Sequence, residues 1–215
     1  MPVEVKICGL STPETVEGSI AAGADYIGLN FYPTSPRYVT LERAAELAAI
    51  ARGRVKIVAL VVDAPDSLLQ DIMAKVDPDF IQAHGAEDPA RIAAIAGLTG
   101  RPVIKAIRVR DGADIAAAAD FAGVASFILY DAKAPETLTD ALPGGNGHAF
   151  DWQLLGGTRR PAFMLAGGLT WDNVADAIRL TGAPVVDLSS GVETAPGVKD
   201  IGLIRKFIEA AKHPR

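Results

Sequence analysis

The stretch Val185-Val186-Asp187-Leu188-Ser189-Ser190-Gly191-Val192-Glu193 is a short apolar run that leads directly into a Ser-Ser-Gly loop. An apolar run broken only by Asp187 predicts a buried strand. The upstream run Ala162–Ala166 ends in the same way, in a Gly-Gly pair. Glycine lets the backbone approach a ligand, and exposed amides can bind an anion, so the two loops together predict a shared phosphate site. The alternative is that both are ordinary tight turns. The predicted phosphate-binding residues are Gly167, Gly168, Ser190 and Gly191.

Composition favours one compact domain over residues 1–215. The chain is 49% hydrophobic, and its 21 basic and 26 acidic residues give a net charge of −5 with no block of like charges. This balance argues against a nucleic-acid-binding surface or a basic membrane helix. A single Cys excludes an internal disulfide and a cysteine metal cluster. We see no signal segment and no apolar run long enough to span a membrane, so we expect a cytoplasmic protein.

Short apolar runs alternate with longer Ala-rich amphipathic segments along the whole chain. The expected strands are Val3–Cys8, Tyr26–Phe31, Lys56–Val62, Phe80–Ala83, Val103–Ile107, Ser126–Tyr130, Ala162–Ala166 and Val185–Leu188. Helix starts between them are indicated at Ser11–Glu14, Thr40–Arg43, Ala64–Asp66, Glu87–Pro89 and Thr170–Asn173. Strict strand–helix alternation predicts an α/β fold with a parallel sheet, and eight units close it into a (β/α)8 TIM barrel. Phosphate commonly binds after strands seven and eight of such barrels. An open doubly wound sheet is the alternative.

One interval breaks the alternation. Residues 132–150 are rich in Pro and Gly and show no helical period, and only Asp151–Leu155 resembles a short helical turn. Long loops in compact domains are usually functional or disordered. We therefore expect an abbreviated helical element and a long loop over the site after strand six, with disorder as the alternative.

Polar residues at the carboxyl ends of barrel strands are the catalytic candidates. They are Cys8, Asn30, Asp63, His84, Arg108, Asp131 and Asp187. Ligands this scattered make a metal site improbable, and no hydrolase triad is apparent. Cys8 ends a strand and precedes Gly9, which indicates a role, although lone cysteines are mostly buried hydrophobes.

Lys6 lies two residues before Cys8, so the two side chains share a face of the first strand. If Cys8 faces the barrel mouth, Lys6 lies inside the barrel and needs an acidic partner, Asp187 or Asp131. Its ammonium would also favour the Cys8 thiolate, so we expect a lowered pKa for that thiol. In the alternative, Lys6 faces outward between helices.

Several motifs carry a family resemblance that spans nearly the whole chain. They are Lys6-Ile7-Cys8-Gly9-Leu10, Gly23–Phe31, Ser35-Pro36-Arg37-Tyr38-Val39, Gln82-Ala83-His84-Gly85, Phe150-Asp151-Trp152, Leu165–Leu169, Asp187–Glu193 and Pro196–Asp200. In this combination and order, the chain resembles the phosphoribosylanthranilate isomerases of tryptophan biosynthesis.

The resemblance implies an Amadori rearrangement of N-(5-phosphoribosyl)anthranilate to 1-(2-carboxyphenylamino)-1-deoxyribulose 5-phosphate. It implies Cys8 as the general base and Asp131 as the general acid, which calls for a partly desolvated Asp131. Arg37 matches the contact to the anthranilate carboxylate, and His84 and Asp187 are further substrate-binding candidates. No metal or cofactor is implied, because the protonated imine of the substrate is its own electron sink. The only partner expected is the small phosphosugar substrate, and we expect a monomer rather than a dimer.

Two departures from the family pattern stand out. Ala83 replaces a common Leu, which predicts altered packing against helices rather than altered chemistry. The loop Gly144–His148 has Asn and His where relatives carry Ser or Thr and Lys, so its substrate contacts are open. Two other functions are weighed: a related isomerase that accepts both this substrate and a histidine-pathway analogue, and a catalytically silent binding barrel. The Cys8–Asp131 pair argues against both, since the first typically uses paired aspartates.

Overall fold

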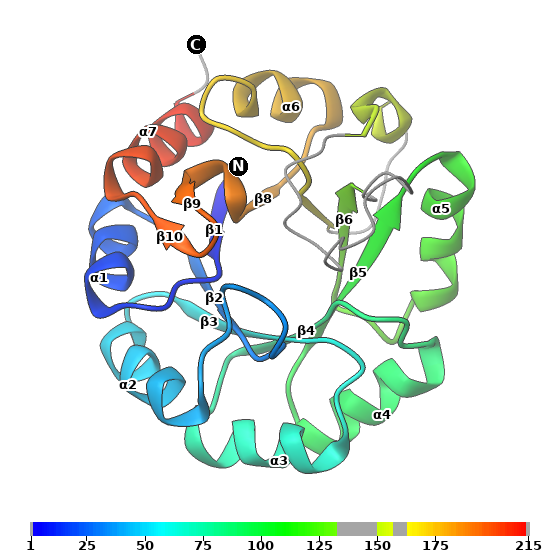
Figure 1. Ribbon diagram of the computed structural model, residues 1–215. Coiled ribbons are helices and arrows are strands. Elements are labelled where there is room, and N and C mark those ends of the chain that lie inside the picture. The colour runs from blue at the N-terminus through cyan, green and yellow to red at the C-terminus, as the bar shows by residue number, and fades with distance from the viewer. Residues whose placement is uncertain (1, 133–149, 157–162, 214–215) are drawn as a thin grey trace.

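The computed structural model is a closed barrel of parallel strands surrounded by helices, and it describes residues 2–132, 150–156 and 163–213 (Figure 1). Neighbouring strands pair in chain order from β1 to β8, and β8 pairs with β1 to close the barrel. The barrel strands are β1 (Glu4–Cys8), β2 (Tyr26–Asn30), β3 (Lys56–Val61), β4 (Phe80–Ala83), β5 (Val103–Val109), β6 (Phe127–Ala132), β7 (Phe163–Leu165) and β8 (Val185–Leu188). The predicted (β/α)8 barrel is therefore confirmed, with strand ends shifted by up to two residues.

Helices cover the outside of the barrel. They are α1 (Pro13–Ala22), α2 (Leu41–Ala51), α3 (Asp66–Lys75), α4 (Pro89–Thr99), α5 (Gly112–Ala116), α6 (Val174–Thr181) and α7 (Ile201–Lys212), with 3₁₀ turns η1 (Ala117–Phe121), η2 (Trp152–Leu155) and η3 (Ser190–Val192). Side chains of Thr12, Thr40 and Asp88 cap the first turns of α1, α2 and α4, as the sequence predicts. The helix expected from Thr170 begins later, at Val174, because residues 171–173 form turns.

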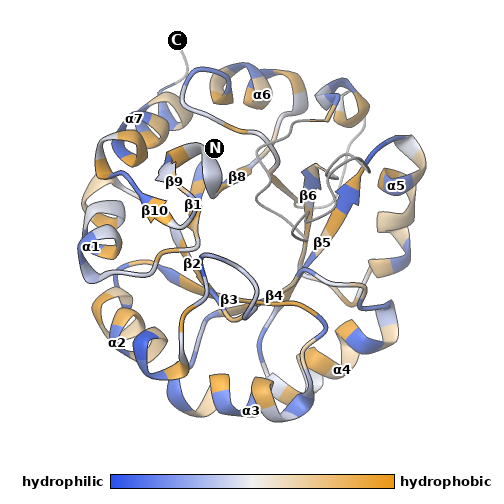
Figure 2. Ribbon diagram, viewed as in Figure 1, coloured by the Kyte–Doolittle hydropathy of each residue, from blue (hydrophilic) through white to orange (hydrophobic). Residues whose placement is uncertain are grey.

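Strand alternation divides the core into two clusters. Residues such as Val58, Ile104 and Leu129 form a cluster inside the barrel. Residues such as Val5, Ile7 and Ala83 belong to the larger cluster that packs strands against helices. Ala83 thus packs on the outside, as expected from its alternation with His84. Figure 2 shows that the outer helices carry both apolar and polar residues, consistent with one face on the core and one in solvent.

Two elements interrupt the barrel repeat. Between β6 and β7, the described residues 150–156 contain the 3₁₀ turn η2, where the sequence predicts a short helical turn. Most of the predicted loop over the site, including Gly144–His148, lies outside the described residues. After β8 and η3, the chain forms an unpredicted antiparallel hairpin of β9 (Glu193–Ala195) and β10 (Val198–Lys199), labelled in Figure 1. None of the described helices is both long and apolar enough to cross a bilayer.

Candidate active site

Lys6 and Cys8 lie on the inner face of β1, because Val5 and Ile7, which alternate with them, belong to the outer cluster. Lys6 is 0% exposed, and its Nζ donates to Asp187 Oδ1 at 2.9 Å. The two residues are register partners on β1 and β8. The expected acidic partner of Lys6 is therefore Asp187, and the alternative of an outward-facing Lys6 is wrong.

The Cys8 thiol is buried at the carboxyl end of β1. Burial raises the pKa of Cys8 above its ordinary value and outweighs the lowering effects of Lys6 and Lys199. The expected net lowering of this pKa is therefore wrong, because desolvation of the thiolate exceeds the attraction of its cations. Burial alone would lower the pKa of Lys6, but the charges and hydrogen bonds of Asp187 and Cys8 raise it. Lys6 consequently stays an ammonium beside the sulfur.

Asp131 lies on β6, and His84 follows β4. Asp131 is buried, and its Oδ1 accepts from Ala132 N at 2.9 Å, while Oδ2 lies 3.3 Å from His84 Nε2. Gln82 Nε2 lies 2.9 Å from His84 Nδ1. With the amide donating to Nδ1, the neutral imidazole carries its proton on Nε2, towards Asp131. His84 Nε2 makes no hydrogen bond within the described residues. It is therefore a buried polar atom that can form a hydrogen bond with a substrate or with Asp131.

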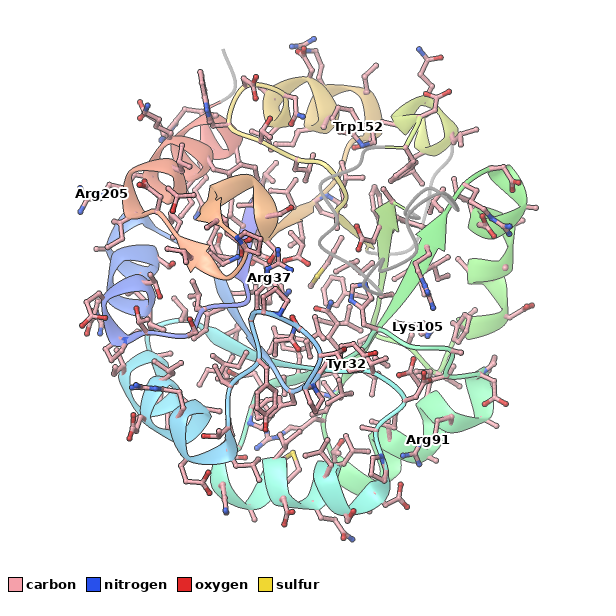
Figure 3. The ribbon with its side chains drawn as sticks, viewed as in Figure 1. Tyr32, Arg37, Arg91, Lys105, Trp152 and Arg205 are labelled. Carbon is pink, nitrogen blue, oxygen red and sulfur yellow. The ribbon has the colours of Figure 1, made fainter. Side chains whose placement is uncertain are left out.

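A buried ion pair holds the loop that carries His84. Lys105 Nζ donates to Glu87 Oε2 at 2.7 Å and to Gly85 O at 2.8 Å. Glu87 in turn accepts from Gly85 N, so both sides of this glycine are fixed. Figure 3 shows Lys105 on the far side of the barrel from Arg37. His84 thus projects from a backbone that two charged side chains restrain.

Arg37 follows β2, and the local sequence places it. Asn30 Nδ2 donates to Ser35 Oγ, which accepts from Arg37 N at 3.2 Å. The guanidinium is bound on one edge by Glu193, with Nε to Oε1 at 2.7 Å and Nη2 to Oε2 at 2.8 Å. Asn30, a strand-end candidate, therefore shapes the loop of Arg37. Arg37 itself reaches the hairpin that follows β8 (Figure 3).

The loops after β7 and β8 meet, as expected for a shared site. A Cβ on Gly191 would overlap the carbonyl oxygen of Leu169, so the two loops touch backbone to backbone. Gly167 and Gly168 have φ angles of 85° and 63°, which suit glycine. Their amides donate no hydrogen bond within the described part of the chain. The first loop therefore offers partly exposed donors to an anion.

Other strand-end candidates have structural or undefined roles. Asp63 Oδ1 accepts from Ala86 N at 2.8 Å and links the loops after β3 and β4. Arg108 is exposed and pairs in register with Asp131. Among the described residues, no three His, Cys, Asp or Glu side chains gather as metal ligands.

Sequence reasoning gave no role to Glu193, Lys199, Ser189 or Gly28. Lys199 Nζ donates to Glu193 Oε1 at 2.7 Å and to Ser189 Oγ at 3.0 Å. The available signal was a pair of opposite charges flanking a Pro-Gly turn immediately after the last barrel strand. Gly28 was signalled only by its place in a strand, where glycine marks close approach of a neighbour.

Comparisons with known proteins agree with this geometry. A family model described as N-(5'phosphoribosyl)anthranilate (PRA) isomerase matches residues 5–210. The chain is 54% identical over 213 residues to the N-(5'-phosphoribosyl)anthranilate isomerase of Rhodopseudomonas palustris strain BisA53, covering 99% of this chain and 97% of that protein. The crystal structure of phosphoribosyl anthranilate isomerase from Thermotoga maritima matches with a TM-score of 0.87 and 35% identity, over 98% of each chain. A crystal structure of such an isomerase in complex with reduced 1-(o-carboxyphenylamino)-1-deoxyribulose 5-phosphate matches with a TM-score of 0.84 and 33% identity, again over 98% of each chain.

Proposed function

Because the chain belongs to the N-(5'-phosphoribosyl)anthranilate isomerase family and catalyses the rearrangement of that phosphosugar, we propose that Cys8 is the base and Asp131 the acid. The observation that carries this assignment is their placement at the carboxyl ends of β1 and β6, the end of a barrel where active sites lie. Both side chains are buried, which suits groups that exchange protons with a substrate rather than with water.

The reaction needs one proton delivered and one removed. Asp131 gives its proton to the ring oxygen as the bond from that oxygen to C1 breaks, and the anilinic nitrogen forms an iminium with C1. The Cys8 thiolate then removes the proton from C2, and the electrons of that bond flow towards the iminium nitrogen. The resulting enolamine becomes the ketone of the product when C1 gains a proton and the hydroxyl group on C2 loses one. The substrate accepts these electrons itself, so this mechanism uses no cofactor.

Each end of the substrate has a proposed partner. Arg37 presents a planar cation to the anthranilate carboxylate. The amides of the loops at Gly167, Gly168, Ser190 and Gly191 receive the phosphate, supported by the two hydrogen-bond donors of the first loop that the described protein leaves unused. His84 contacts the substrate through Nε2 beside the acid, and Asp187 acts through Lys6 beneath the base.

Turnover can be followed by the loss of anthranilate fluorescence. Wild-type protein should isomerise the substrate, and Cys8→Ser and Asp131→Asn should each lower kcat by about 100-fold to 10,000-fold while still binding the reduced product. Near-normal turnover in either variant would remove that residue from its role. The control is Lys75→Met, which changes only an exposed ion pair with Glu42 on the outer helices.

We also propose that the protein acts in the cytoplasm as a monomer on this small substrate. Large exposed apolar side chains in the described structure lie on separate segments rather than on one element, which supports a monomer. They are Tyr38, Leu98, Trp171, Leu180 and Val198. Light scattering during size-exclusion chromatography tests the oligomeric state, and a mass twice the 22.4 kDa of one chain would contradict it.

A further inference from the structure

The β9–β10 hairpin packs against the loop that carries Arg37. Gly197 turns the chain between its strands with a φ of 82°, directly after Pro196. A Cβ at this position would overlap the carbonyl oxygen of Pro36. The hairpin therefore lies in backbone contact with the residue before Arg37, and it cannot shift without moving that loop.

Glu193 of this hairpin lies between two cations. Its Oε1 accepts from Arg37 Nε and Lys199 Nζ, both at 2.7 Å, and its Oε2 accepts from Arg37 Nη2 at 2.8 Å. The side chains of Lys199, Glu193 and Arg37 are only 1%, 5% and 7% exposed. Burial alone would raise the pKa of Glu193, but Arg37 and Lys199 outweigh it and lower the pKa. The carboxylate is therefore charged and holds the guanidinium in one plane.

Lys199 extends the same network to the strand that carries the base. Its Nζ donates to Ser189 O at 2.8 Å and to Ser189 Oγ at 3.0 Å. Ser189 Oγ donates in turn to Cys8 O at 3.1 Å. On the other side, Arg37 covers Gly9, where a Cβ would lie 2.7 Å from Arg37 Cδ. Both branches of the network thus end at the Cys8–Gly9 peptide.

We propose that Glu193 and Lys199 are a positioning pair, which orients Arg37 for the substrate's carboxylate and fixes the strand end that carries Cys8. The inference rests on the proposed roles of Arg37 and Cys8. A buried ion pair gives little net stability over apolar residues of similar size, whereas breaking one leaves an unpaired buried charge. Its value here lies in geometry, since two hydrogen bonds to one carboxylate fix the plane in which the guanidinium of Arg37 meets a ligand.

The first test compares two ligands in Glu193→Gln, which keeps the shape of the side chain and removes its charge. One ligand is reduced 1-(o-carboxyphenylamino)-1-deoxyribulose 5-phosphate, and the other is the same molecule without the carboxyl group. We expect the Kd of the first to rise about tenfold or more, as for loss of one charged hydrogen bond, and that of the second to change by less than about twofold. An equal weakening of both ligands, or no change in either, would overturn the proposal.

Two reference proteins separate this inference from the proposed function. Wild type must turn over the substrate, and Arg37→Lys must discriminate between the two ligands in the same direction as Glu193→Gln. If wild type fails to turn over, the proposed function fails. If wild type and Arg37→Lys behave as expected and Glu193→Gln does not discriminate, only the positioning role is wrong. Should Glu193→Gln not fold, Glu193→Asp keeps the charge, shortens its reach and carries the same comparison.

The second test addresses the branch to Cys8. The charged groups acting on this thiol are Lys6, Asp187 and Lys199. Lys199→Met removes the donor to Ser189 and, below about pH 8, one of the two cations near the thiol, so we expect kcat to fall about tenfold below that pH and the deficit in kcat/KM to shrink above it. Loss of folding stability alone would give a deficit without this dependence on pH. A deficit that stays constant across about pH 8 in folded Lys199→Met, matched to Lys75→Met, would therefore overturn this half of the proposal.

Discussion

Cys8 and Gly28 face each other across β1 and β2, and the glycine makes room for the sulfur. They are register partners, and a Cβ on Gly28 would lie 2.7 Å from Cys8 Sγ and 3.2 Å from Lys6 Nζ. Real Cβ atoms do not approach sulfur this closely, so any side chain at position 28 must displace the thiol. The sulfur and the ammonium of Lys6 can lie side by side only because this position lacks a side chain.

Gly28→Ala should therefore damage activity more than stability. We expect destabilisation of about 1–3 kcal/mol from overpacking and a fall in kcat/KM of up to about 100-fold, because a shift of about 1 Å at a reacting group has that effect. Urea unfolding and the fluorescence assay measure the two quantities. The matched control is Gly97→Ala in α4, where a Cβ meets nothing within 4 Å and should add about 0.5–1 kcal/mol of stability. Wild-type kcat/KM in folded Gly28→Ala would show that the sulfur's place is not critical.

The pH profile of kcat/KM should be a bell, since the reaction needs a proton on the acid and none on the base. Reference pKa values are about 8.5 for a thiol and about 3.9 for an aspartic acid, so the alkaline limb belongs to the thiol and only a small fraction of the enzyme holds thiolate and protonated acid together. Burial raises the pKa of Cys8, which moves this limb to higher pH. Lys6→Met removes the strongest lowering effect on this pKa, so the limb should move higher and the plateau should fall as the reactive thiolate becomes scarcer.

Lys6→Met also leaves Asp187 buried without its ammonium, which costs about 3–5 kcal/mol. The double variant Lys6→Met/Asp187→Asn removes both charges and serves as the folded control. An unchanged profile in a folded variant would reduce Lys6 to a structural residue.

The sequence predicted the site correctly where strand alternation alone decides which face of a strand a side chain occupies. If Cys8 faces the barrel mouth at the end of its strand, Lys6 must lie inside the barrel. A buried ammonium then needs an acidic partner, and in the structure this partner is Asp187. The same logic placed Ala83 among the outer core residues. These predictions hold because a period of two along a strand is independent of tertiary detail.

Sequence-based prediction failed where opposing effects on one pKa are of similar size, and where strands are very short. The net pKa shift of Cys8 depends on how far the thiolate is desolvated, which a list of neighbouring charges does not contain. The β9–β10 hairpin has strands of three and two residues, too short to show alternation, so the sequence signals the pairing of Glu193 with Lys199 only by their opposite charges on either side of Pro196-Gly197.

The phosphate loops offer a test by steric change. A Cβ on Gly191 would overlap the Leu169 carbonyl oxygen, so Gly191→Ala must separate the loops after β7 and β8. We expect KM to rise about tenfold or more, because several charged hydrogen bonds to phosphate lose their geometry together. Gly112→Ala, where a Cβ meets nothing within 4 Å, is the control. A ligand-bound structure in which basic side chains rather than these amides hold the phosphate would contradict the assignment.

Lys199 should give stability an unusual dependence on pH. Burial lowers its pKa from 10.5 to about 8, despite the opposing charge of Glu193. Between these values the unfolded chain binds more protons at this site than the folded chain, so the contribution of Lys199 to the free energy of unfolding rises with pH. Below about pH 8 Lys199 is an ammonium in the folded and the unfolded chain alike, so its titration adds nothing to the free energy of unfolding. Urea unfolding from about pH 7.5 to about pH 10 should show wild type gaining on the order of 2–3 kcal/mol relative to Lys199→Met.

The difference in free energy of unfolding between wild type and Lys199→Met separates the titration of Lys199 from that of groups present in both proteins. Burial raises the pKa of Cys8 and of Tyr26, and both shifts lower the stability of either protein as pH rises. Lys75→Met is the opposite case, because the hydrogen bond that the exposed Lys75 donates to Glu42 raises the pKa of Lys75. Its difference from wild type should not grow between about pH 8 and about pH 10. A Lys199→Met difference that stays flat or shrinks in that window would mean that the buried ammonium is fully compensated by Glu193, and that the lowered pKa of Lys199 is wrong.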